Sequence, residues 1–141
     1  MSGRSGYSDL CPRVDLYQRA VENAINGKRG QRFVREAIAA LDALPEPKLV
    51  ADELTDGRGG YCLLGAVGRA RGVEDRKLRA LEDERPSYVA QELGLDIAGS
   101  LAAEIVNEND ADWFGPETDA QRFARVRRWL AGHVRGSSAK P

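Results

Sequence analysis

Apolar side chains recur every three or four residues over two stretches near the start of the chain, which is the spacing of one helix face. Residues 12–26 carry the first stripe, and Pro12 suits a first helical turn, where its missing N–H costs no hydrogen bond. Residues 31–44 carry the second stripe, which ends before Pro45. We expect Gly27 to end the first helix in the left-handed conformation. The two segments predict an αα-hairpin.

Further along the chain, the same periodicity predicts helices over 61–71, 88–93, 97–110 and 118–134. Asp96 is the expected N-cap of the third of these, and Thr118 with Gln121 has the spacing of a capping box before the fourth. Gly65 and Gly68 each cost about 1 kcal/mol relative to alanine inside a helix. We therefore expect a neighbouring backbone to pack closely against them.

The middle of the chain has a weaker pattern. Residues 49–54 fit either a short strand or one helical turn, since periodicity does not separate the two in so short an apolar run. The glycine-rich run over 56–60 is a turn signal, which leaves open a short β-hairpin near 49–62. Residues 74–85 are highly charged and are interpreted as a connector.

These elements predict a mainly α-helical protein, a compact bundle of about five to six helices. The 141 residues fit one domain. We place it at 12–135, between a flexible N-terminal arm (1–11) and a disordered tail (136–141). No apolar run approaches the roughly eighteen residues that span a bilayer, and the first ten residues lack a signal peptide's apolar stretch. We expect a cytoplasmic protein that does not contact a membrane.

Metal and cofactor chemistry has few candidate residues. One histidine and two cysteines cannot form a Cys/His zinc tetrad. The glycines at 57–60 match neither phosphate-binding glycine pattern. Trp113 stands where a calcium loop beginning at Glu108 needs glycine. We expect no metal and no cofactor.

Cys62 is the main candidate for catalysis. It follows the glycine-rich turn and opens a predicted helix, where the helix dipole lowers a thiol's pKa. His133 is the single imidazole that could act as its base, with Asn107 or Asp110 orienting it. The alternative is that Cys62 is a small buried apolar residue and that His133 caps the end of a helix. We favour this structural interpretation, because the dyad rests on residue types alone.

Charge is distributed unevenly along the sequence. Residues 88–119 hold eight acidic residues and no Lys or Arg, whereas residues 120–141 hold six basic residues and no acid. One interpretation is that the two segments lie together and partly neutralise each other. The other is a binding surface of two signs that steers a charged partner.

The last predicted helix combines arginines with an aromatic residue. Arg125, Arg127 and Arg128 lie close to Trp129 in sequence. Such a helix could bind nucleic acid without sequence preference, or it could anchor a protein, since Trp and Arg are frequent at interface hot spots. Trp113 and Phe114, in the acidic stretch, are a second possible anchor.

Several segments together resemble a known group of proteins. They are LVADELTDGRGGYCLLGAVGRARGV, VAQELGL, LAAEIVNEND and RFARVRRWL. The chain resembles, over about 14–135, a family of short uncharacterised proteins of proteobacterial phages and prophages. Cys62, Leu64, Gly65 and Ala66, with Asn109 and Asp110, also look distantly like an actinobacterial domain of unknown function. The resemblance implies a phage-encoded protein acting in a bacterial cytoplasm, and it brings no activity with it.

The leading hypothesis is a phage accessory protein that binds a host protein stoichiometrically and inhibits host defence, as anti-CRISPR proteins do, or a host regulator. The expected surface comprises Trp113, Phe114, Arg125, Arg127 and Arg128. One alternative is a hydrolase or transferase that uses Cys62 and His133. The other is a non-specific nucleic-acid binder that uses the arginine-rich helix. We expect binding rather than catalysis.

Overall fold

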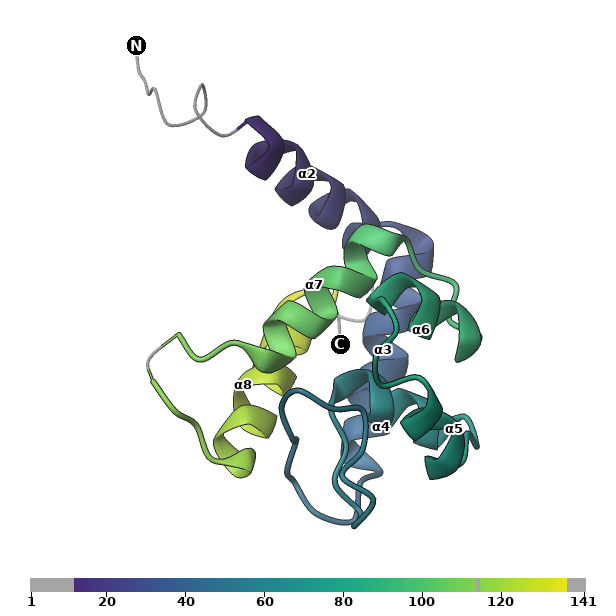
Figure 1. The fold of residues 1–141 in the computed structure, drawn as a ribbon. Coiled ribbons are helices and arrows are strands. Elements are labelled where there is room, and N and C mark those ends of the chain that lie inside the picture. The colour runs from purple at the N-terminus through teal and green to yellow at the C-terminus, as the bar shows by residue number, and fades with distance from the viewer. Residues whose placement is uncertain (1–11, 114, 137–141) are drawn as a thin grey trace.

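The computed structural model describes residues 12–113 and 115–136, with side chains from Asp15 onward. Within these ranges the chain forms seven helices (Figure 1): α2 (Pro12–Asn26), α3 (Lys28–Asp42), α4 (Leu63–Ala70), α5 (Asp75–Ala80), α6 (Pro86–Glu92), α7 (Gly99–Asp110) and α8 (Asp119–Gly132). The prediction of a mainly α-helical protein is confirmed. The predicted arm (1–11), Phe114 and residues 137–141 of the predicted tail lie outside the described residues.

The first two helices pack against each other, and the N-terminal end of α2 projects from the rest of the protein (Figure 1). The expectation of a left-handed Gly27 is wrong. Its φ of −79° and ψ of 175° are extended, and it is the N-cap of α3. The chain turns directly into the next helix, so α3 begins at Lys28 rather than at residue 31. Gly30 allows this turn, because a Cβ there would overlap the carbonyl oxygen of Ala24.

The segment 49–62 is a loop whose two arms meet at one antiparallel bridge, between Thr55 and Tyr61. The Cys62 N–H also donates to the Leu54 carbonyl at 3.2 Å. Of the β-hairpin that the sequence left open for this segment, only this single bridge forms. The turn between the arms is held instead by the Asp56 carboxylate, which accepts from the N–H groups of Arg58 at 2.7 Å and Gly60 at 2.9 Å.

Helix α4 begins after this loop and is buried along most of its length. A Cβ on Gly65 would overlap the carbonyl oxygen of Leu54 and lie 2.9 Å from its carbonyl carbon. The expectation that a backbone packs closely on these glycines is therefore confirmed at Gly65. Gly68 instead faces the side chains of Leu93 and Leu78, at 3.1 and 3.2 Å from the position a Cβ would take.

Two helix predictions need correction. The segment interpreted as a charged connector contains helix α5. Because Leu78 is the one buried residue of α5, the helix has no repeating apolar positions that would reveal it in the sequence. Asp96 does not cap α7, whose N-cap is Ala98. Asp96 instead accepts a hydrogen bond from Arg29 at 2.9 Å. The capping box of Thr118 with Gln121 at the start of α8 is confirmed.

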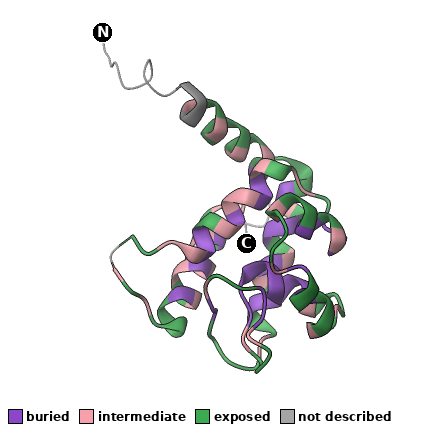
Figure 2. Cartoon of the chain, in the orientation of Figure 1, coloured by how far each residue is buried: buried purple, intermediate pink, exposed green. Residues whose placement is uncertain are grey.

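The buried apolar residues of the described ranges, except Val50, form one contiguous cluster. Figure 2 shows them gathered where α3, α4, α7 and α8 face one another, whereas the outer part of α2 is mainly exposed. Val34, Leu63, Leu101, Ile105 and Leu130 are fully buried at the centre. In the part of the chain that the structure describes, no helix is long and apolar enough to cross a membrane.

Candidate functional site

Cys62 has a structural role at the start of α4. It is the N-cap of the helix, and its Sγ accepts a hydrogen bond from the Gly65 N–H at 3.3 Å. The residue is 7% exposed. Burial, with a smaller contribution from the nearby Asp110 carboxylate, raises the pKa of the Cys62 thiol to about 12. The thiol is therefore protonated at neutral pH, and the helix N-terminus does not activate it.

His133, the expected base for Cys62, interacts with Trp129 instead. Its Nδ1 is 2.8 Å from the Trp129 carbonyl oxygen, and its ring packs edge-on against the Trp129 ring with centroids 5.0 Å apart. Asp110 accepts from the Asp52 N–H at 3.0 Å. Among the described residues, no hydrogen bond joins His133 to Cys62 or to Asp110. The three residues do not form a relay, which argues against the proposed catalytic group.

The raised pKa of Cys62 gives a testable pH dependence. The folded protein holds the thiol proton up to about pH 12, whereas the unfolded chain loses it near its ordinary value of 9.0. The native state thus binds more protons between these values. This contribution to the free energy of unfolding is present below pH 9 and lost as the pH rises, by at most about 1.4 kcal/mol per pH unit.

Urea unfolding of the wild type and Cys62→Ser at pH 8 and pH 10 measures this effect, because serine keeps an N-cap oxygen but does not titrate in this range. We expect a steeper loss of stability for the wild type. We also expect native Cys62 to resist iodoacetamide at pH 8, as followed by peptide mass spectrometry. Rapid alkylation, or the same pH dependence in both proteins, would show that the thiol is not held neutral.

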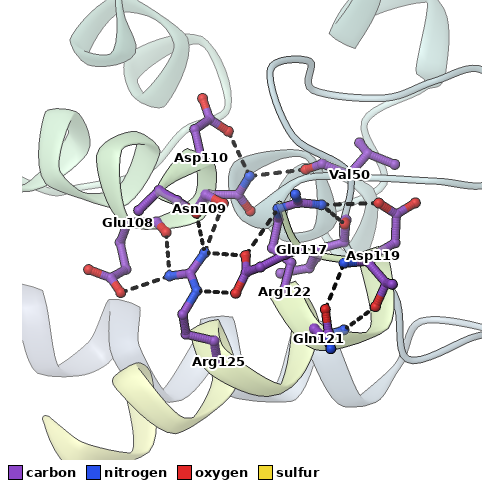
Figure 3. A network of polar contacts seen from close by, with 12 residues as sticks. Val50, Glu108, Asn109, Asp110, Glu117, Asp119, Gln121, Arg122 and Arg125 are labelled. Carbon is purple, nitrogen blue, oxygen red and sulfur yellow. Dashed lines mark hydrogen bonds and ion pairs between the residues drawn. The ribbon is translucent and has the colours of Figure 1, made fainter. Parts of the chain in front are cut away.

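A buried polar cluster joins α7, α8 and the 49–62 loop (Figure 3). Asn109, at the end of α7, is 2% exposed. Its Oδ1 accepts from the Leu63 N–H at 2.9 Å, and its Nδ2 donates to the Val50 carbonyl at 3.0 Å and to Asp110 Oδ1 at 2.9 Å. Asn109 thus satisfies a free N–H in the first turn of α4 and fixes the loop before it. This structural role of Asn109 cannot be predicted from the sequence, because its partners Val50 and Leu63 lie far from it along the chain.

Arg125 makes more hydrogen bonds than the other residues of this cluster, and its side chain is 14% exposed. It donates to the Glu117 carboxylate at 2.8 and 3.0 Å and to Glu108 Oε2 at 3.0 Å. It also donates to the main-chain carbonyls of Glu108 at 2.7 Å and Ala111 at 3.0 Å. These carbonyls end α7, where a cation is favourable. Arg125 therefore holds these segments together, and little of its side chain is exposed for the partner contact that the sequence predicts.

The two glutamates that pair with Arg125 have pKa values shifted in opposite directions. Burial raises the pKa of Glu108, and the hydrogen bond from Arg125 lowers the pKa of Glu117. Both therefore depend on the same guanidinium for their charge to be tolerated. Figure 3 shows Glu117 between Arg125 and Arg122. Arg122 extends the cluster to the 49–62 loop, because it donates to the Leu49 carbonyl.

The remaining arginines of α8 differ in how far they are paired. Arg122 is buried and donates to the Leu49 carbonyl at 2.9 Å and to Asp119 at 3.0 Å. Arg127 forms a two-bond pair with Asp42, each bond 2.8 Å long. Arg128 is exposed and has no ion pair within the described ranges. The interpretation that the acidic and basic segments partly neutralise each other is confirmed for Arg122 and Arg125.

Trp113 is the most exposed large hydrophobic residue in the described part of the chain, at 68%. It borders an open hollow of about 880 Å³ between α2, α7 and the loop that follows α7. Tyr17 and Val21 line the α2 side, and the hollow also carries four carboxylates: Glu22, Glu104, Asp110 and Asp112. None of the four forms an ion pair with another described residue.

Neither a metal site nor a similarity to known proteins assigns a function to this chain. In the described ranges, no three His, Cys, Asp or Glu side chains are grouped so as to hold a metal ion. The comparisons with known proteins give no match, since no family model, no curated protein and no solved structure matches this chain.

Proposed function

We propose that this protein is a small phage accessory protein that acts in the bacterial cytoplasm by stoichiometric binding to a host protein. The bound host protein is a component of host defence, as for an anti-CRISPR protein, or a host regulator, and binding inhibits it. The sequence resemblance supports the phage setting. The observation that carries the binding role is the exposed indole of Trp113 beside an acidic hollow.

An exposed tryptophan of this kind supports a protein interface. A large aromatic side chain provides much contact area at low entropic cost, and Trp is enriched among residues that dominate binding energy. The unpaired carboxylates around it add a negative potential that attracts a basic partner surface. Arg125 and Arg127 are engaged within the fold, so the proposed surface rests on Trp113 and the hollow rather than on α8.

The structure lends less support to the two alternatives. A hydrolase or transferase would need a reactive thiolate, and Cys62 is buried with a raised pKa. A nucleic-acid groove would need several free arginines on α8, whereas Arg122, Arg125 and Arg127 are ion-paired and, among the described residues of α8, Arg128 alone is not.

Capture from a nuclease-treated proteobacterial lysate, followed by mass spectrometry, tests the proposal. We expect one host protein to be recovered stoichiometrically by the wild type and lost with Trp113→Ala, a change of about 2 kcal/mol or more at a hot spot. Tyr88→Ala is the matched control, because Tyr88 is an exposed aromatic on α6 at 43% exposure and does not line the hollow.

Recovery of the same protein by wild type and Trp113→Ala alike would exclude this surface. Recovery that disappears with Tyr88→Ala as well, while both variants remain folded by circular dichroism, would place the interface elsewhere.

A further inference from the structure

A second cavity shares Asp110 as a lining residue with the Trp113 hollow and has a volume of about 270 Å³. It is partly open to solvent and is lined by the loop before α4, the start of α4, the segment after α5, and helices α6 and α7. Its floor is apolar and includes Leu64, Leu81, Val89 and Ile105. These residues also belong to the core, so the cavity opens directly onto the centre of the protein.

Every charged residue that lines this cavity is acidic: Asp52, Glu53, Glu82, Glu84 and Asp110. None of these five carboxylates has an ion pair among the described residues. Glu82 and Asp110 do have structural hydrogen bonds, because they accept the N–H groups of Leu54 at 3.0 Å and of Asp52 at 3.0 Å. The rim therefore keeps a strong negative potential, which an apolar floor of low dielectric reinforces.

An apolar floor and an acidic rim together favour a bound group that has both an apolar part and a positive charge. A small hydrated metal ion gains nothing from apolar walls. An arginine or lysine side chain fits both features, since its aliphatic stem packs on apolar surface while its charge stays at the edge. Sites for drug-sized ligands occupy about 300–1000 Å³. At about 270 Å³ the cavity lies just below this range, and it is large enough to hold one long side chain.

We propose that this cavity receives an arginine or lysine side chain from a segment of the partner protein. The proposal rests on the proposed function and adds a second anchor to it. Asp110 lines both the cavity and the Trp113 hollow, so one bound protein reaches both sites. The cavity would then select, among possible partners, those that present a basic residue within an otherwise apolar segment.

Methyl NMR with defined peptides tests the cavity independently of any host protein. The probe is acetyl-Leu-Arg-Leu-amide, and its matched control replaces arginine by citrulline, which has nearly the same shape but no charge. We expect the arginine peptide to cause saturable shifts of the methyl groups of Val89, Ile105 and Val106. We expect no shifts with the citrulline peptide at the same concentration.

Two variants examine the rim. Glu53→Gln with Glu84→Gln removes two exposed carboxylates that have no hydrogen bond or ion pair among the described residues. We expect this double variant to weaken the arginine peptide about fivefold, because it removes two of the charges that complement the guanidinium. Asp83→Asn is the control, because Asp83 is exposed between Glu82 and Glu84 but does not line the cavity.

Equal shifts with both peptides, shifts confined to other methyl groups, or equal weakening by Asp83→Asn would overturn the proposal. Free arginine that binds as tightly as the peptide would identify a small-molecule site instead. Shifts that depend on protein concentration without peptide would assign the cavity to a second copy of this chain. If the peptide binds but Trp113→Ala does not affect capture of the host protein, the cavity proposal stands and the Trp113 surface is excluded; if no host protein is captured at all, the proposed function fails.

Discussion

Replacement of Gly65 by alanine is expected to prevent stable folding. The new Cβ would overlap the Leu54 carbonyl oxygen, and both atoms belong to backbone rather than to flexible side chains. Leu54 cannot move away without loss, because its carbonyl accepts the Cys62 N–H at 3.2 Å and its N–H donates to Glu82 at 3.0 Å. We expect a cost above about 4 kcal/mol, which approaches the whole stability of a domain at the lower end of the usual range of about 5–15 kcal/mol.

Urea unfolding followed by circular dichroism measures this cost, with Gly132→Ala as the matched control. Gly132 is also helical, but a Cβ there would meet no atom within 4 Å. Alanine at that position is expected to stabilise the protein by up to about 1 kcal/mol, as in other helices. A Gly65→Ala protein as stable as the wild type would show that Leu54 does not pack against α4 in this way.

The second large effect is expected for Arg125→Met. Methionine keeps much of the side-chain volume but removes the charge and every hydrogen bond. Glu108 would then remain largely buried without a cation, Glu117 would keep only the more distant Arg122 at 3.8 Å, and carbonyls at the end of α7 would lose their donor. Breaking a buried pair in this way costs about 3–5 kcal/mol, because the uncompensated charges stay behind.

Thermal unfolding with Arg128→Met as control separates this effect from a general change of charge on α8. Arg128 is exposed, so its replacement is expected to change stability by about 0.5 kcal/mol or less. Arg125→Lys should recover only part of the loss, since one ammonium group cannot replace a guanidinium that binds two carboxylates and several carbonyls. Equal stability of the Arg125→Met and Arg128→Met proteins would contradict the role given to Arg125.

Most of the helical architecture could be predicted from local patterns. The stripes of α2, α3 and α8 are wide, and the capping box of Thr118 is a strictly local signal. Helix α5 could not be found this way, because its stability comes from Leu78 packing onto a core assembled from distant segments. Asp96 is a good N-cap by residue type, but its interaction with Arg29, 67 positions earlier, decides its role.

The candidate site shows the same division between local and distant interactions. The sequence identified Cys62, but its burial and its raised pKa depend on the surrounding fold. It identified Arg125 as an exposed anchor, because nothing local indicates that Glu108 lies 3.0 Å away. Trp113 was selected as an anchor and is exposed. The cavity next to Asp110 was not predicted, since its walls come from five separate segments.

Isothermal titration of the captured host protein tests the central claim most directly, namely that the Trp113 hollow binds the partner stoichiometrically. We predict a one-to-one complex that Trp113→Ala weakens roughly 30-fold, the equivalent of about 2 kcal/mol. Arg128→Glu should change the affinity by about twofold at most, as expected for a surface substitution outside the interface. Full affinity of Trp113→Ala, together with loss of binding by Arg128→Glu, would contradict the account and place the interface on α8.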